Sequence, residues 1–158
     1  TPFEIGRAEI LWDSVNSKFP PKARLAKGGE ILNSVGIIAC GPLVYEALFA
    51  ARELEKIGID CIVVNNHTIK PMDERTIIHV AKLCGCVVTV EEHQVNGGMG
   101  SAVAEVLSRN FPVPQEYIGM PDSFGESGAP NALLEKYGMT CKDIISKAKE
   151  VIARKQRG

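Results

Sequence analysis

Three short stretches of the chain are apolar at consecutive positions and not at alternating ones, apart from Thr89 in the last stretch. They are Val35 to Ala39, Cys61 to Val64 and Val87 to Val90. A strand that is apolar at every position is buried on both faces, as strands are in a parallel sheet covered by helices. The pattern therefore predicts three central strands of a parallel sheet.

A helical pattern follows each predicted strand. The helices are expected after Gly41-Pro42, after an Asp73 N-cap that follows Pro71-Met72, and after the cluster from Gly97 to Gly100. Gly85 is expected to end the second helix. The inner faces are predicted from spacing to be Val44, Ala47, Leu48, Ala51 and Leu54, then Ile77, Val80, Ala81 and Cys84, then Met99, Val103, Val106 and Leu107. The alternation predicts an α/β fold: a three-layer, mostly parallel open sheet with helices on both faces.

The C-terminal part carries weaker signals of the same kind. Glu116 to Gly119 predicts a fourth strand. Pro130 suits the first turn of a helix, and Thr140 with Asp143 resembles a capping box at the start of the last helix. Two closing helices are therefore expected.

The N-terminal part is less regular. Glu9 to Trp12 could form an edge strand, whereas residues 12–34, with Pro20-Pro21 and Gly28-Gly29, predict an irregular loop or insertion. Thr1-Pro2-Phe3 resembles mid-chain sequence, so we expect a piece of a longer polypeptide. The length of 158 residues suits one hydrophobic core, and we expect a single domain over residues 1–158.

The composition is that of an ordinary globular domain, with 45% hydrophobic and 23% charged residues. A net charge of -1 gives no broad electrostatic reason to bind nucleic acid or an anionic membrane. No apolar run approaches the roughly 20 residues of a membrane span, and five cysteines suit a reducing compartment. We expect a soluble, cytoplasmic protein, whose basic tail of Arg154, Lys155 and Arg157 complements the C-terminal dipole of the last helix.

The cluster from Gly97 to Gly100 lies between a strand and a helix, which is where a phosphate can bind backbone N–H groups. Val103 stands where a dinucleotide fingerprint requires glycine or alanine. Glu91-Glu92 at the end of the strand would also repel a diphosphate. We therefore favour a structural turn over a nucleotide site.

The acidic pair and the following His93 lie beyond the carboxyl end of a strand, where open α/β sheets usually bind ligands. Consecutive strand residues face opposite ways, which weakens a paired-carboxylate site and favours an interface turn. The candidate interface or ligand crevice consists of Glu91, Glu92, His93, Asn96, Gly97, Gly98, Gly100 and Ser101.

The other polar and sulfur groups do not form a recognisable catalytic set. His67 and His79 have no spaced partner for a metal, and Cys84-Gly85-Cys86 is interpreted as core packing. The nucleophile-elbow, P-loop and zinc-protease patterns are absent. We predict no catalytic, cofactor-binding or metal-binding residue in this chain.

Several motifs occur together in one order. They are Phe3 to Leu11, Ala39 to Pro42, Thr68 to Asp73, Val87 to His93, Gly97 to Glu105 and Phe124 to Gly128. In this order they resemble the C-terminal domain of transketolase, over nearly the whole chain except residues 12–34. The Asn65-Asn66 pair lacks the Gly-Asp-Gly of the family's cofactor-metal motif, so we interpret it as coincidental.

The resemblance implies part of an enzyme that moves a two-carbon ketol unit from a ketose phosphate to an aldose phosphate. It implies that thiamine diphosphate and a divalent metal, Mg or Ca, are held by the N-terminal domains or by a separate subunit. It also implies a homodimer in which this domain is structural and non-catalytic. The alternatives are the corresponding domain of 1-deoxyxylulose-5-phosphate synthase or of a 2-oxo acid dehydrogenase β subunit, or a small-molecule-binding regulatory module.

Overall fold

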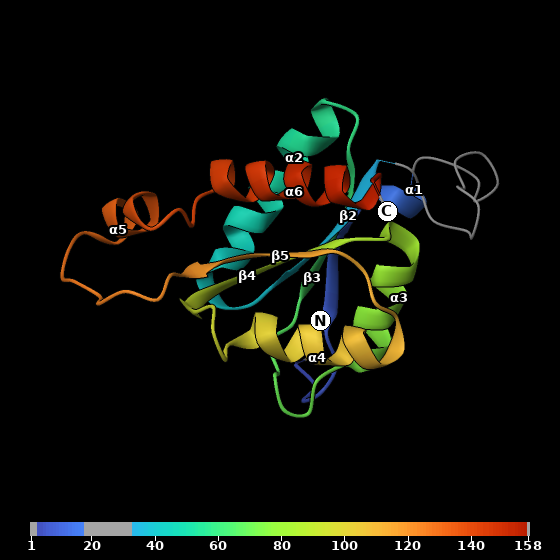
Figure 1. Ribbon diagram of the computed structural model, residues 1–158, viewed down its shortest axis with the longest axis horizontal. Coiled ribbons are helices and arrows are strands. Elements are labelled where there is room, and N and C mark those ends of the chain that lie inside the picture. The colour runs from blue at the N-terminus through green and yellow to red at the C-terminus, as the bar shows by residue number, and fades with distance from the viewer. Residues whose placement is uncertain (1–2, 18–32, 158) are drawn as a thin grey trace.

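The computed structural model describes residues 3–17 and 33–157, which form one five-stranded sheet (Figure 1). The strands lie in the order β1-β3-β2-β4-β5, and all neighbours are parallel except β1, which is antiparallel to β3 at one edge. Their bounds are β1 (Glu9–Asp13), β2 (Ser34–Ala39), β3 (Asp60–Asn65), β4 (Val87–Gln94) and β5 (Gln115–Met120). The predicted strands, including the edge strand, are confirmed.

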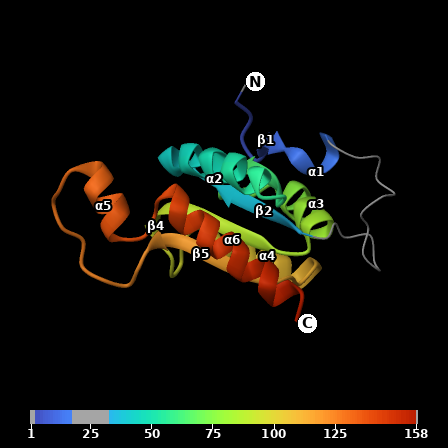
Figure 2. The same cartoon turned by 90° about the horizontal axis from the view of Figure 1, so that it is seen from above.

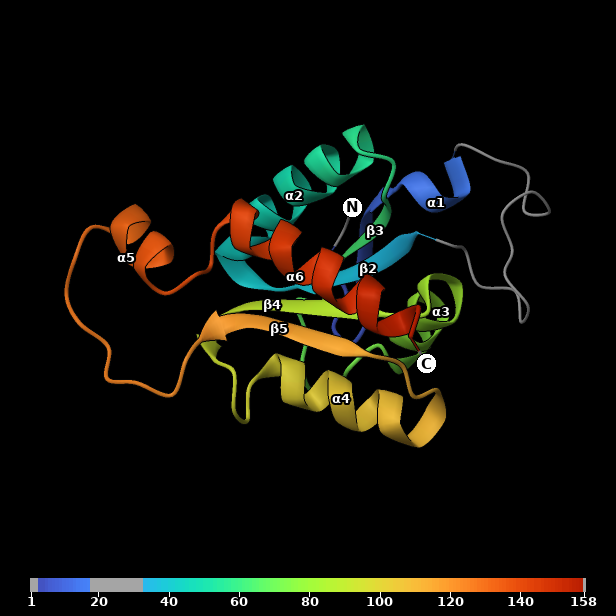
Figure 3. The ribbon, with the colours of Figure 1, turned by 45° about the horizontal axis from the view of Figure 1, so that its top comes forward.

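Helices cover both faces of this sheet (Figure 3). Helices α2 (Val44–Lys56) and α6 (Cys141–Lys155) cover one face, and α3 (Glu74–Cys84) and α4 (Met99–Asn110) cover the other. Within β2, Ile37 belongs to the first apolar core and Ile38 to the second, and both are fully buried. The shorter helices are α1 (Ser14–Ser17), the 3-10 turn η1 (Gly41–Leu43) and α5 (Pro130–Lys136). The three-layer α/β prediction is confirmed.

Local signals set the ends of the long helices. The Asp73 carboxylate accepts a hydrogen bond from the Thr76 amide at 3.0 Å and caps α3, and Gly85 ends that helix in the left-handed region at φ 67°. Thr140 and Asp143 form the expected capping box before α6. In the described residues, no helix is long and apolar enough to cross a membrane.

The prediction of an irregular segment over residues 12–34 is wrong at both ends. Trp12 and Asp13 continue β1 beyond a bulge, because they pair with Val63 and Ile62 of β3. Helix α1 follows directly, and Ser34 begins β2. The middle of the segment, residues 18–32, lies outside the described residues.

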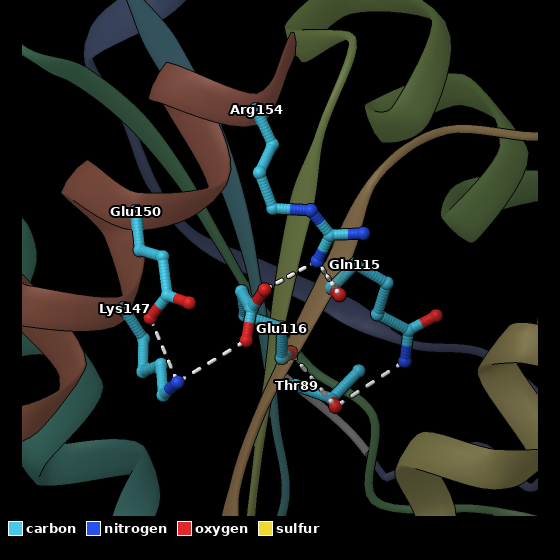
Figure 4. Close-up of polar contacts among 6 residues, drawn as sticks. All are labelled: Thr89, Gln115, Glu116, Lys147, Glu150 and Arg154. Carbon is cyan, nitrogen blue, oxygen red and sulfur yellow. Dashed lines mark hydrogen bonds and ion pairs between the residues drawn. The ribbon is translucent and has the colours of Figure 1, made fainter.

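The basic tail has partners beyond its own helix dipole. Arg154 forms an ion pair with Glu116 of β5, and Lys147 of α6 lies 3.2 Å from the other oxygen of the same carboxylate (Figure 4). Lys155 donates a hydrogen bond at 2.6 Å to the carbonyl of Cys84. Cys84 is the last residue of α3. These contacts fasten α6 across the edge strand and to the far helix layer.

Candidate functional site after strand β4

The candidate residues lie where the strand order reverses. The chain passes from β2 to β3 on one side and from β4 to β5 on the other, so β2 and β4 flank the switch point of the sheet. Open α/β sheets bind ligands most often at this point, beyond the carboxyl ends of the strands. Strand β4 runs to Gln94, and the turn that follows leads into α4.

Glu91 is an internal anion at the start of α4. Its side chain is buried, with 3% of its surface exposed, and its two carboxylate oxygens accept hydrogen bonds from the Met99 amide at 2.6 Å and the Gly100 amide at 2.8 Å. Helix N-termini favour negative charge, so this carboxylate satisfies the groups that a phosphate would use. Glu92 is exposed, as expected for the next residue of a strand.

Two glycines of the turn are required by packing within the chain. A Cβ at Gly98 would lie 2.3 Å from the Glu91 carboxylate, and one at Gly100 would lie 2.6 Å from the Thr89 hydroxyl and 2.8 Å from the Tyr117 ring. The space that a ligand would need beside these glycines is therefore filled by the chain itself.

The remaining groups of the turn also bond to one another. Gly97 adopts φ 81°, and its amide donates to the Ser101 hydroxyl at 2.9 Å. That hydroxyl donates to the Val95 carbonyl at 3.1 Å. The turn is a closed hydrogen-bonded unit, which explains why glycine-rich sequence at this place need not indicate a nucleotide site.

Gln115 of β5 contacts both β4 and the first turn of α4. Its side-chain amide donates to the carbonyl of Gly100 at 2.9 Å. The same amide lies 3.4 Å from the Thr89 hydroxyl (Figure 4). Glu116, the next residue, binds Lys147 and Arg154 of α6. The turn is thereby connected to the helix layers on both faces of the sheet.

The structure therefore divides the candidate residues into two groups. The contacts inside the turn join Glu91, Gly97, Gly98, Gly100 and Ser101. The rim of the turn, which we define as Glu92, His93 and Asn96, is exposed. The Nδ1 atom of His93 lies 3.0 Å from the Gln94 carbonyl. Within residues 3–17 and 33–157, no acidic or basic side chain is hydrogen-bonded to His93. This arrangement offers a firm surface and lacks a catalytic pair.

A hollow of about 330 Å³ beside the rim was not predicted from the sequence. Its apolar wall comes from Met120, Leu133, Leu134, Tyr137 and Met139, and its polar wall includes Glu92 and Glu126. These residues come from three separate segments, so only the folded chain brings them together.

Other polar and sulfur groups lie at the same edge of the sheet. Burial, and then the negative charge of Glu91, raise the pKa of the Cys40 thiol to about 11, so the reactive thiolate is disfavoured near neutral pH. The Phe3 ring packs on His67 with centroids 4.5 Å apart. Within residues 3–17 and 33–157, no group of three or more His, Cys, Asp or Glu side chains could hold a metal ion. The buried Asn66 side chain has no hydrogen-bond partner in that part of the chain.

Sequence comparisons connect the chain with transketolases and with 1-deoxy-D-xylulose-5-phosphate synthases. The family model of the transketolase C-terminal domain matches residues 28–144. A 6-deoxy-6-sulfo-D-fructose transketolase subunit of Clostridium sp. (strain MSTE9) is 45% identical over 150 residues, which are 94% of this chain and 46% of that protein. A 1-deoxy-D-xylulose-5-phosphate synthase of Desulforudis audaxviator is 36% identical over 97% of this chain and 22% of its own length. The chain thus spans less than half of these relatives.

Solved structures agree with the sequence relatives. A split gene transketolase, described as an inactive β4 tetramer, superposes with a TM-score of 0.81 at 39% identity, over 98% of this chain and 45% of that one. A transketolase from Leishmania mexicana superposes with a TM-score of 0.57 at 23% identity over 78% of this chain and 17% of that one, which is a likeness of fold alone.

Proposed function

The chain belongs to the transketolase C-terminal domain family, and we propose that it is the non-catalytic C-terminal part of a transketolase. The complete enzyme would transfer a two-carbon ketol unit from a ketose phosphate to an aldose phosphate. The observation that carries the non-catalytic role is the Glu91 carboxylate on the amides of Met99 and Gly100, because it fills the most ligand-like place in the fold.

The thiamine cofactor belongs to other domains in this proposal. The residues after β4 do not fit a diphosphate, because the amides at the start of α4 are already bonded to a carboxylate. We infer that thiamine diphosphate and its divalent metal, Mg or Ca, are bound by N-terminal domains, either in the same polypeptide or in a partner subunit. Residues 1–158 would then act as one domain attached to that thiamine-binding part.

The rim of the turn is proposed as an interface within the assembled enzyme. Glu92, His93 and Asn96 are exposed on a turn whose interior is fixed by hydrogen bonds. A preorganised surface loses little conformational freedom on binding, which suits a permanent interface. We propose a homodimer or a larger assembly in the cytoplasm, in line with the tetramer described for the split gene relative.

The identity of the donor can be tested on the complete enzyme. We expect ketol transfer from a ketose phosphate, and the relative that is 45% identical makes 6-deoxy-6-sulfo-D-fructose a second candidate donor. Each donor is supplied with an aldose phosphate, and the new ketose is measured. A parallel assay supplies pyruvate as donor and glyceraldehyde 3-phosphate as acceptor. Release of carbon dioxide with formation of 1-deoxy-D-xylulose 5-phosphate there, and no ketol transfer in the first assay, would favour the synthase alternative instead.

The regulatory-module alternative has its own test. Calorimetry of the chain with nucleotides and sugar phosphates should give no binding heat, because the turn has no free amide cradle. Saturable heat that is lost in Ser101→Ala or Glu91→Gln would favour a small-molecule site and would contradict the interface proposal.

A further inference from the structure

An arm extends from the body of the molecule beyond β5. We define the arm as residues 121–137, which include the loop from Pro121 to Ala129 and helix α5. Figures 1 and 2 show it projecting away from the sheet and from the four long helices. Helix α5 contains no buried residue. The body of the chain therefore leaves most of the arm surface uncovered.

The arm nevertheless has a defined shape of its own. The Glu126 carboxylate forms an ion pair with Lys136 and lies 3.0 Å from the Tyr137 hydroxyl, which joins the loop to the end of α5. Gly128 packs so closely on Leu133 that an added Cβ would lie 3.1 Å from its side chain. Internal bracing of an exposed segment suits a part that binds a protein surface, because less freedom is lost on docking.

The base of the arm is fixed as well. The Gln94 side-chain amide, at the end of β4, donates to the Asp122 carboxylate at 2.9 Å. This bond ties the first residues of the arm to the strand that carries Glu91 and the rim of the turn. The arm and the rim therefore belong to one continuous surface.

The arm carries both a projecting ring and a receiving hollow. Phe124 is 100% exposed. The hollow of about 330 Å³ lies between the arm and the sheet, and its apolar lining includes Leu133, Leu134 and the buried Met139. A dry apolar cavity of about 150 Å³ is enough to hold a benzene ring. The hollow is therefore large enough to accept one phenylalanine side chain.

Resting on the transketolase assembly proposed above, we infer that this arm pairs with the arm of a second copy of the chain, each Phe124 entering the hollow of the other copy. In a two-fold interface the same surface is used by both subunits, so a ring and a hollow on one surface can satisfy each other reciprocally. The ion pair with Lys136 neutralises Glu126, one of the two carboxylates that line the hollow. A second copy is favoured as the occupant because the split gene relative, of the same fold over 98% of this chain, is described as a tetramer of one subunit type.

The test compares two exposed phenylalanines in the full-length enzyme. Phe124→Ser removes the projecting ring, and Phe49→Ser on α2 is the matched control, since Phe49 is 55% exposed and lies outside the arm. Sedimentation velocity over a range of concentrations gives the self-association constant. We expect Phe124→Ser to weaken self-association at least about tenfold, as for a buried aromatic anchor, and Phe49→Ser to leave it unchanged.

A cross-link identifies the partner surface. Phe124→Cys and Leu134→Cys proteins are mixed and oxidised, and we expect a covalent dimer that contains one of each. Phe49→Cys mixed with Leu134→Cys is the control, which also accounts for the native cysteines. Three results would each overturn the pairing. The first is equal cross-linking in the two mixtures, and the second is a covalent bond to the thiamine-binding part instead of a second copy. The third is a Phe124→Ser enzyme that self-associates as strongly as the unchanged protein. These readouts do not depend on transfer activity, so a dimer without activity would refute the proposed reaction and leave the pairing intact.

Discussion

At the scale of single residues, the Glu91 carboxylate occupies the place at the start of α4 where an anionic ligand could bind. Glu91 is nearly inaccessible to solvent, yet its charge is balanced by two amide donors at the positive end of α4. A buried carboxylate without such donors would be costly. These two hydrogen bonds close the turn between β4 and α4.

Glu91→Gln should destabilise the chain. The amide side chain removes the negative charge and one of the two acceptor oxygens, so we expect the free energy of unfolding to fall by about 1–3 kcal/mol, as for hydrogen bonds to a charged group. Urea denaturation of the chain measures this loss. Glu92→Gln is the control, because Glu92 is exposed. Equal midpoints for the two variants would show that the cap does not hold the turn.

Gly98→Ala tests the packing of the same turn. The added Cβ would lie 2.3 Å from a Glu91 oxygen and 2.6 Å from the Gln94 carbonyl, so the turn must shift to accept it. We expect a loss of about 1–3 kcal/mol, which is typical of overpacking. At Gly125 a Cβ meets nothing within 4 Å, so Gly125→Ala should leave the thermal midpoint unchanged. A Gly98→Ala protein as stable as Gly125→Ala would contradict the close approach.

Asp73 should contribute to the acid sensitivity of the fold. Burial alone would raise the pKa of its carboxyl, but hydrogen bonds from Thr76 and Ala8 and the charge of Arg7 hold that pKa below its ordinary value. The unfolded chain then binds the proton more readily, so this contribution is complete above the unfolded pKa and is lost as pH falls through the folded pKa. We measure the free energy of unfolding at about pH 7 and about pH 3. Between these two values, Asp73→Asn should lose less free energy of unfolding than the unchanged chain. Equal losses would contradict this role.

At the scale of elements, much of the fold follows from apolar spacing. The buried runs at residues 35–39, 61–64 and 87–90 lie in central strands, and the caps at Asp73 and Thr140 begin their helices. These features are local, because each depends on neighbours within one or two turns. Hydrophobic periodicity and capping chemistry are therefore sufficient to find them.

The features that spacing does not predict depend on distant partners. Strand β4 continues through the polar residues 91–94 because β5 pairs alongside it as far as Gln94 and Met120. Strand β1 extends one residue beyond the predicted edge strand, to Asp13, past a bulge that only the pairing with β3 reveals. The sequence placed Glu91 at the end of a strand, but its bond to Met99 depends on how strand and helix close on each other. The hollow beside the rim likewise needs three separate segments.

Glu116 should hold α6 against the edge of the sheet. Its carboxylate is largely buried and binds both Lys147 and Arg154, whereas Glu150 pairs with Lys147 alone and is half exposed (Figure 4). We expect Glu116→Gln to speed hydrogen exchange of the α6 amides, and Glu150→Gln to change it little, since exposed ion pairs contribute little. Equal exchange rates of the α6 amides in the two variants would contradict this attachment.

At the scale of the whole molecule, the described residues form an α/β body in which the switch point after β4 is closed by side chains of the protein itself. Beside that point the rim of the turn is exposed, and so is the arm with its uncovered Phe124. The braced arm, with Phe124 exposed and the hollow beside it, is the surface for which pairing with a second copy is proposed. The molecule is therefore best understood as one part of a larger enzyme.

A titration of ketol-transfer activity tests this account most directly. A fixed amount of the thiamine-binding part, supplied with thiamine diphosphate and Mg²⁺, receives increasing amounts of this chain, and the ketose product is measured. The account predicts no transfer by the chain alone, a rise in activity that saturates near one chain per thiamine-binding part, and the same saturating rate with His93→Ala. Transfer by the chain without the thiamine-binding part, or a saturating rate abolished by His93→Ala in a fully assembled complex, would contradict it.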